Sequence, residues 1–206
     1  MKKSLLMKSL LAVSFIGAST SAFAVAPNRG EVYFERISYN GSGCPQGSVY
    51  ENLASDNKAF TLTFAEYFAE ADSNKRVDRK FCQLTIDLKI PQGFQFAIGT
   101  FDYRGFVALD RGAMAMHQTS YYFQGQGRTG GVSKQIQGPI QDDFFFREQV
   151  GLASIVWSPC GETRALNIKT SIMARSNGRA YGYIGNDSVD GSLSQEYSLM
   201  WRRCSR

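Results

Sequence analysis

The sequence contains a single histidine, His117, and this scarcity limits the chemistry open to the chain. There is also no G-x-S-x-G motif, and none of the four cysteines lies in a C-x-x-C pair. A Ser-His-Asp or Cys-His catalytic site would therefore have to use His117, which as a strand histidine is more typical of a surface or hydrogen-bonded structural role. Zinc binding and thiol redox chemistry need close cysteine spacing, so the sequence argues against both.

Long hydrophobic runs are also missing. After the N-terminus no apolar stretch approaches the roughly 18 residues of a membrane-spanning helix, so we expect no transmembrane segment. The first residues are different: lysines precede a short apolar run over residues 10–18, and Ala22-Phe23-Ala24 fits an A-x-A cleavage site. This pattern predicts a signal peptide over residues 1–24, a mature chain from Val25, and export to the periplasm or the outside. No cysteine lies beside the cleavage point, so a lipid anchor is not expected.

The mature chain, without the predicted leader, has little net charge. The formal net charge of +5 includes three leader lysines, so the mature chain has 20 basic residues against 18 acidic ones, a net charge of +2. The basic residues are dispersed rather than clustered, and a nearly balanced surface gives no electrostatic case for nucleic-acid binding.

Residues 25–206 suit one domain, because no Pro-rich or Ser-rich linker divides them and no internal repeat is found. Alternation of apolar and polar residues is clearest over 81–90, where every second side chain is apolar. Similar patterns predict further strands over 31–38, 59–64, 94–109, 113–123, 153–157, 166–174, 179–184 and 195–203. The segment 64–70 is the exception and predicts one or two helical turns. The glycine-rich segment 125–138 predicts a long mobile loop. Many short strands with little helix predict an all-β chain, an antiparallel β-sandwich or jelly roll.

Four cysteines behind an export signal predict a disulfide-braced domain. Cys44 and Cys160 lie in tight turns, whereas Cys82 and Cys204 lie on predicted strands. Four cysteines allow three pairings, and joining each turn cysteine to the next strand cysteine favours Cys44–Cys82 with Cys160–Cys204. Each such bridge is expected to stabilise the fold by roughly 4 kcal/mol in the chain-entropy model.

Five short motifs carry a resemblance to a known family. They are GSGCPQGS around Cys44, DYRG at 102–105, WSPCG at 157–161, NDSVD at 186–190 and WRRC at 201–204. In this order they resemble a secreted family of bacteria and fungi, domain of unknown function 4360. The resemblance covers nearly all of the mature chain and implies an all-β, disulfide-containing exported domain. It implies no activity, cofactor or catalytic residue.

Acidic and amide side chains give two further hypotheses. A carboxylate pair for glycoside hydrolysis would come from Asp142 and Asp143 with Glu148, or from Glu66 with Glu70. Separately, the loop residues Asn186, Asp187 and Asp190 offer oxygen ligands for a structural Ca²⁺. The ordinary alternative for that loop is an Asx-turn between two strands.

Clustered aromatic residues suggest a binding surface. Where aromatic side chains follow one another along a strand, both faces cannot be core. Exposed rings beside polar side chains suit a glycan or a partner protein, although each ring can instead belong to the core. The candidate binding residues are Tyr103, Arg104, Tyr121, Tyr122, Phe144 and Phe145.

Three functions remain open. The favoured one is a non-catalytic, monomeric module that binds a protein or a carbohydrate at or outside the cell surface, without a cofactor. The alternatives are a secreted hydrolase with a carboxylate pair, and an inhibitor or effector that acts through the loop 125–138. Enzymatic activity is not favoured, because no catalytic constellation is evident.

Overall fold

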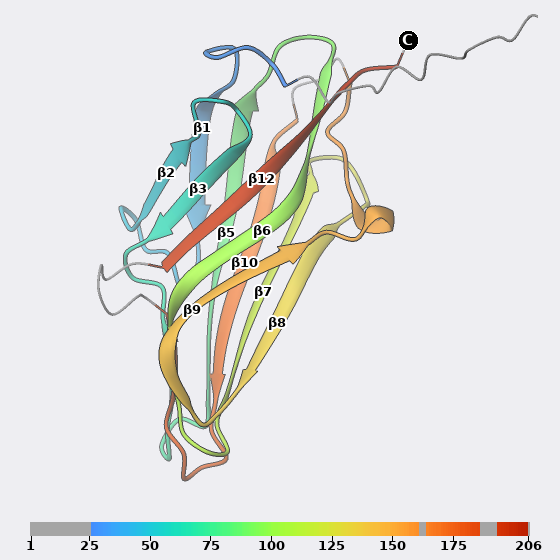
Figure 1. The fold of residues 1–206 in the computed structure, drawn as a ribbon. Coiled ribbons are helices and arrows are strands. Elements are labelled where there is room, and N and C mark those ends of the chain that lie inside the picture. Colours follow the sequence, from blue (N-terminus) through green and yellow to red (C-terminus); the bar gives the residue numbers. More distant parts are fainter. Residues whose placement is uncertain (1–25, 161–163, 186–192, 206) are drawn as a thin grey trace, which may run out of the picture.

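The computed structural model describes residues 26–160, 164–185 and 193–205, and these form two antiparallel β-sheets packed face to face. Figure 1 shows one sheet in front of the other, with the long strands of the front sheet running obliquely across the steeper strands of the sheet behind. The predicted signal peptide over residues 1–24 lies outside the described residues. The fold is the predicted all-β sandwich.

The five-stranded sheet has the order β1-β5-β10-β7-β8. Its strands are β1 (Tyr33–Asn40), β5 (Val77–Lys89), β10 (Leu166–Arg175), β7 (Met114–Phe123) and β8 (Gly130–Gln137). The central strands β5, β10 and β7 alternate buried and more exposed residues, so each gives one face to the core and the other to solvent.

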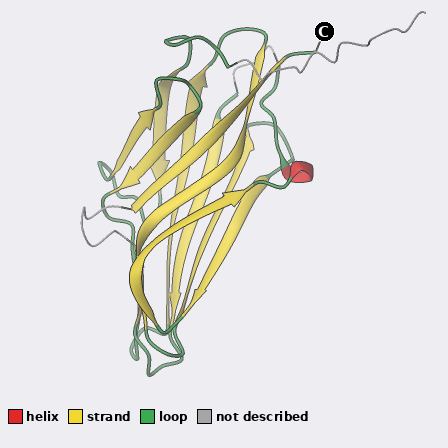
Figure 2. Ribbon diagram, in the orientation of Figure 1, coloured by secondary structure: helices red, strands yellow, loops and turns green. Residues whose placement is uncertain are grey.

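The seven-stranded sheet is built around the longest strand, β6. Its strands are β2 (Val49–Leu53), β3 (Ala59–Phe64), β12 (Leu193–Arg203), β6 (Phe94–Leu109), β11 (Gly182–Gly185), β4 (Ala69–Ala71) and β9 (Ile140–Gln149). Strands β12 and β11 share one edge of β6, while β9 pairs along the other edge. Among the described residues the one helical element is a 3-10 turn, η1 (Leu152–Ser154), seen in Figure 2.

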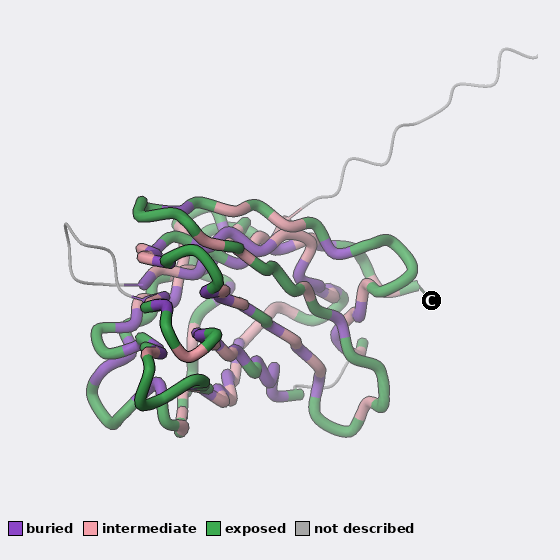
Figure 3. The backbone as a smooth tube through the Cα atoms, turned by 90° about the horizontal axis from the view of Figure 1, so that it is seen from below, coloured by how far each residue is buried: buried purple, intermediate pink, exposed green. Residues whose placement is uncertain are grey.

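The core lies between the sheets and is rich in aromatic rings. Figure 3 shows buried and exposed segments alternating along the chain. The largest fully buried side chains include Tyr67, Tyr103, Tyr121 and Tyr197. Tyrosine brings a hydroxyl into the core, where such groups are usually hydrogen-bonded; the Tyr121 hydroxyl donates to the Ile98 carbonyl and the Tyr197 hydroxyl to Gln195 Oε1.

Both disulfides have the favoured pairing. Cys44–Cys82 has a Cα–Cα distance of 5.5 Å, and Cys160–Cys204 one of 5.8 Å. Cys82 lies in β5 as expected, whereas Cys204 lies just after the end of β12. Each bridge ties a loop to the strand system, and the described residues include no free cysteine.

Three local predictions were wrong. The segment 125–138 is not one long loop, because Gly130–Gln137 forms β8, antiparallel to β7. Strand β8 needs glycine because it packs closely on β7: a Cβ at Gly131 would lie 2.5 Å from the carbonyl oxygen of Thr119. Residues 64–70 contain no helical turn; β3 ends at Phe64 and β4 begins at Ala69. Residues 153–157 are not a strand.

Candidate functional site

The predicted binding residues separate onto the two sides of the strands. The side chains of Tyr103, Tyr121 and Phe144 are buried in the core. These three rings therefore cannot form an exposed binding platform, and for them the alternative that they belong to the core is correct. Arg104 and Phe145 are exposed, and Phe145 is 60% exposed.

Arg104 and Phe145 lie side by side on the outer face of the seven-stranded sheet. In the register of the strands, Arg104 of β6 is opposite Phe145 of β9 on one side and Ser194 of β12 on the other. The neighbouring outward row contains Thr61, Glu196, Asp102 and Arg147, one from each of four adjacent strands. Residues of both rows line a hollow of about 270 Å³, which we call the Arg104 hollow; it is lined by Thr61, Asp102, Tyr103, Arg104, Phe145, Ser194 and Glu196.

An ion pair with Arg147 fixes Asp102, one of the residues that line the Arg104 hollow. Arg147 donates from Nε to Asp102 Oδ1 at 2.9 Å and from Nη2 to Asp102 Oδ2 at 2.5 Å. This two-point contact raises the pKa of Arg147, through the hydrogen bond and the charge of Asp102. The same guanidinium lies over the ring of Phe145, 5.9 Å from its centroid. Arg147 thus joins a buried carboxylate to an exposed aromatic ring and limits the orientation of both.

The Arg104 hollow is electrostatically balanced. Two guanidinium groups, Arg104 and Arg147, lie beside two carboxylates, Asp102 and Glu196. Hydroxyl groups of Thr61 and Ser194 complete the lining. A surface of this kind offers hydrogen-bond donors and acceptors next to an apolar ring, with no net charge to select an ion.

The predicted carboxylate pairs do not converge. Asp142 and Glu148 lie six positions apart on β9, which corresponds to roughly 20 Å along a strand. Carboxyl groups that cleave a glycosidic bond lie within about 10 Å of each other. Glu148 is instead paired with Lys134 of β8 at 3.1 Å.

The other predicted acids, Asp143, Glu66 and Glu70, also do not form a catalytic carboxylate pair. Asp143 follows Asp142 directly in β9, so the two side chains leave opposite faces of the strand. Glu66 lies in the turn after β3, and Glu70 lies in the short strand β4. Both are exposed, and neither lines the Arg104 hollow.

His117 lies in the core, 1% exposed, within a buried polar network. Gln195 contacts the His117 Nε2 atom through its Nε2 at 3.0 Å and donates to Thr170 Oγ1 at 3.1 Å, while the Tyr197 hydroxyl donates to Gln195 Oε1 at 2.5 Å. Because an amide nitrogen can only donate, His117 Nε2 is an acceptor and the imidazole is neutral. Burial lowers the pKa of His117 to about 3. A buried, neutral imidazole of this kind is a structural element.

The predicted calcium ligands Asn186, Asp187 and Asp190 lie outside the described residues. Within the part of the chain that the structure does describe, no group of three or more His, Cys, Asp or Glu side chains is arranged to hold a metal ion. The same part contains no helix long and apolar enough to cross a membrane.

Several residues of the Arg104 hollow were missed from the sequence. Asp102 and Arg104 share the DYRG motif, but no motif in the sequence points to Thr61, Ser194 or Glu196. They come from strands far apart in the chain, and only the strand register brings them into line. The available signal was the alternation along β12, where Ser194 and Glu196 fall between buried residues.

Comparison with known proteins shows the family. The model of the family "Domain of unknown function (DUF4360)" matches residues 31–204. An "Uncharacterized secreted protein" of Arthroderma benhamiae is 38% identical over 183 residues, covering 87% of this chain and 75% of that protein. The chain therefore belongs to the DUF4360 family, as its motifs suggested.

Solved structures give weaker similarities. One is the carbohydrate-binding module TmCBM61 in complex with β-1,4-galactotriose, at 11% identity, with a TM-score of 0.29, covering 83% of this chain and 90% of that one. Another is the agarase AgWH50C, at 15% identity, with a TM-score of 0.25, covering 87% of this chain and 23% of that one.

Proposed function

We propose that this DUF4360 domain is an exported, non-catalytic binding module that holds a neutral carbohydrate in the Arg104 hollow. Export is supported by the leader sequence, by the two disulfides and by the secreted relative. Binding in place of catalysis is supported by the separation of the predicted acids and by the burial of the only histidine.

The observation that carries the proposal is the exposed ring of Phe145 beside Arg104 in a polar hollow. A large aromatic side chain that is 60% exposed loses apolar contact with water when a ligand covers it. The apolar face of a sugar ring can pack on such a ring, while its hydroxyl groups exchange hydrogen bonds with arginine, carboxylate and hydroxyl side chains. Balanced charge around the ring favours a ligand without net charge.

The size of the hollow limits how much ligand it holds. About 270 Å³ lies just below the roughly 300–1,000 Å³ of enclosed small-molecule pockets. The Arg104 hollow would therefore hold one or two sugar units of a longer chain, with the rest lying over the outer face of the sheet. Polysaccharides are accordingly better probes than monosaccharides.

Affinity electrophoresis against a panel of neutral polysaccharides tests the proposal. We expect at least one polysaccharide to retard the mature protein, and Phe145→Ala and Arg104→Ala to reduce that retardation about tenfold or more. Leu152→Ala is the matched control, because Leu152 is 90% exposed but lies in η1, away from the hollow. If every neutral polysaccharide fails, or if Phe145→Ala binds like the wild type, the proposal is wrong. Selective capture of a protein with no retardation in any polysaccharide would replace the carbohydrate with a protein partner.

A further inference from the structure

The outer face of the five-stranded sheet carries a second hollow with a different charge. It has a volume of about 360 Å³ and is lined by Arg79, Phe81, Gln118, Ser120, Lys169 and Ser171. These residues come from the three adjacent strands β5, β10 and β7, so the hollow lies across the middle of the sheet. We call it the Lys169 hollow.

The strand register fixes the arrangement within the Lys169 hollow. Phe81, Ser171 and Gln118 form one row across the three strands. Lys169 and Ser120 belong to the next row on one side, and Arg79 to the next row on the other side. The ring of Phe81, which is 41% exposed, therefore lies between two cationic side chains.

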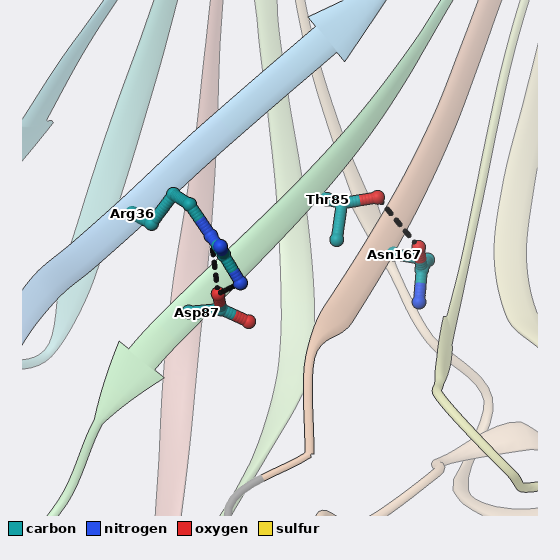
Figure 4. A network of polar contacts seen from close by, with 4 residues as sticks. All are labelled: Arg36, Thr85, Asp87 and Asn167. Atoms are coloured by element: carbon teal, nitrogen blue, oxygen red, sulfur yellow. Dashed lines mark hydrogen bonds and ion pairs between the residues drawn. The ribbon is translucent and has the colours of Figure 1, made fainter.

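Neither cation is neutralised by the protein. Among the described residues, Arg79 and Lys169 take part in no ion pair. The acid that β5 presents on this face, Asp87, is already bound by Arg36, whose Nη2 lies 2.7 Å from Asp87 Oδ2. Figure 4 shows this pair together with the nearby hydrogen bond from Thr85 Oγ1 to Asn167 Oδ1, which is 2.9 Å long. The Lys169 hollow thus keeps two positive charges that no described side chain compensates.

We infer that the Lys169 hollow is a binding site for an acidic polysaccharide, a chain of sugar units that carry carboxylates. A sugar ring would pack on Phe81, its hydroxyl groups would contact Gln118, Ser120 and Ser171, and its carboxylates would meet Arg79 and Lys169. Charge complementarity selects the acidic polymer over a neutral one. Two cations around a single phenyl ring do not make the continuous basic track that a nucleic-acid backbone requires.

This site is independent of the Arg104 hollow, because the two lie on the outer faces of different sheets. Its ligand carries charge, whereas the ligand proposed for the Arg104 hollow is neutral. Substitutions in one hollow should therefore leave binding at the other unchanged. The two proposals can fail separately.

Titration calorimetry with an oligomannuronate tests the inference, with the neutral mannan oligosaccharide of the same linkage and length as the matched ligand. The two differ in the carboxylate alone. We expect the acidic oligomer to bind at least about tenfold more tightly than the neutral one, and added salt to weaken it. Equal affinity for the two oligomers would overturn the inference.

Variants locate the site. Arg79→Ala and Lys169→Ala should each weaken oligomannuronate binding about tenfold, and Phe81→Ala should weaken it as well. Lys89→Ala is the control cation, since Lys89 lies on the same strand as Phe81 but eight positions away, and it should change the affinity by less than about twofold. Unchanged binding in Lys169→Ala would place the ligand elsewhere and reject the site. Polyphosphate binding as tightly as oligomannuronate, with no effect of Phe81→Ala, would reduce the hollow to a non-specific positive patch and reject it too.

Discussion

The imidazole of His117 lies against the phenol ring of Tyr103, with 3.9 Å between the ring centroids, at the interface of the two sheets. His117 comes from the five-stranded sheet and Tyr103 from the seven-stranded sheet. The pair therefore joins the two layers through a polar group placed in an aromatic core. A charge on that imidazole would have to be buried with it.

We expect the stability of the protein to fall as the pH is lowered below 6.5. The pKa of His117 is about 3 in the folded chain against 6.5 in the unfolded chain, so between these values the unfolded state binds the proton. The stability is fully present above pH 6.5 and is lost progressively toward pH 3. The loss attributable to His117 between pH 7 and pH 5 is roughly 2 kcal/mol.

Denaturant unfolding at pH 7 and pH 5 measures this loss. His117→Gln, which keeps a polar side chain but cannot take up the proton, should reduce the difference between the two pH values. Because His117 is the only histidine of the chain, the difference in pH dependence between His117→Gln and the wild type reports on one imidazole. Equal pH dependence of the variant and the wild type would contradict the expectation.

Tyr121 gives a second prediction, since its hydroxyl group holds the segment after β9 against the core. Tyr121 Oη donates to the carbonyl oxygen of Ile98 at 3.1 Å, and the backbone N–H of Val156 donates to Tyr121 Oη at 3.1 Å. Tyr121→Phe leaves these buried backbone groups without their partner. We expect a loss of about 1–3 kcal/mol in the free energy of unfolding.

The amide of Val156 provides the specific readout for Tyr121→Phe. Its hydrogen exchange should become faster than in the wild type, because its acceptor has been removed. Tyr122→Phe makes the same chemical change at the next residue, whose hydroxyl has no hydrogen bond to the described part of the chain, and should cost less than about 0.5 kcal/mol. Slow exchange at Val156 in the Tyr121→Phe variant would show that the attachment of the segment after β9 to the core does not depend on the Tyr121 hydroxyl.

The disulfides should differ in their resistance to reduction. Cys44 and Cys82 are 2% and 0% exposed, whereas Cys160 is exposed at the surface. A thiolate reductant must reach a sulfur atom, so Cys160–Cys204 should open first under native conditions and Cys44–Cys82 should open with unfolding. Trapping of free thiols followed by mass mapping gives the order, and early labelling of Cys82 would contradict it.

The parts of the fold that could be predicted are those in which local pattern and tertiary environment agree. Strand β5 alternates strictly because one face is core, so its residues were recognised from spacing. Strand β9 was not recognised, because Asp142, Asp143 and Phe145 are all exposed at the edge of the sheet, where the environment does not impose alternation. The glycines of strand β8 predict a loop, but they are present because the backbone of β7 approaches too closely for a Cβ.

The candidate site was predicted less completely than the fold. Arg104 and Phe145 belong to local clusters of aromatic and polar residues, yet Asp102, which lines the hollow, is held by Arg147, 45 positions away in the chain. Side chains at such separation meet only through the register of β6 and β9, and that register depends on the whole sheet. Composition alone therefore could not separate Phe145 from the buried Phe144 next to it.

The loop before Cys44 gives the last prediction, because Gly41 lies against the backbone of β5. Its φ angle is +148°, and a Cβ there would lie 2.1 Å from the carbonyl oxygen of Phe81. The same carbonyl accepts a hydrogen bond of 2.9 Å from the N–H of Gly43, so it cannot move away without breaking that contact. Gly41→Ala should therefore destabilise the protein by roughly 3 kcal/mol or more, from backbone strain together with the steric overlap.

Gly47 is the matched control for Gly41, since it lies in the same loop with a φ of +86° but has no atom within 4 Å of an added Cβ. Gly47→Ala should cost about 1 kcal/mol, because it introduces the unfavourable φ without the overlap. Denaturant unfolding of the two variants separates the conformational cost from the steric cost. If both lose the same stability, the close approach of Gly41 to the Phe81 carbonyl does not constrain the loop, and the Cys44–Cys82 bridge and the Gly43 hydrogen bond hold it to β5 without that constraint.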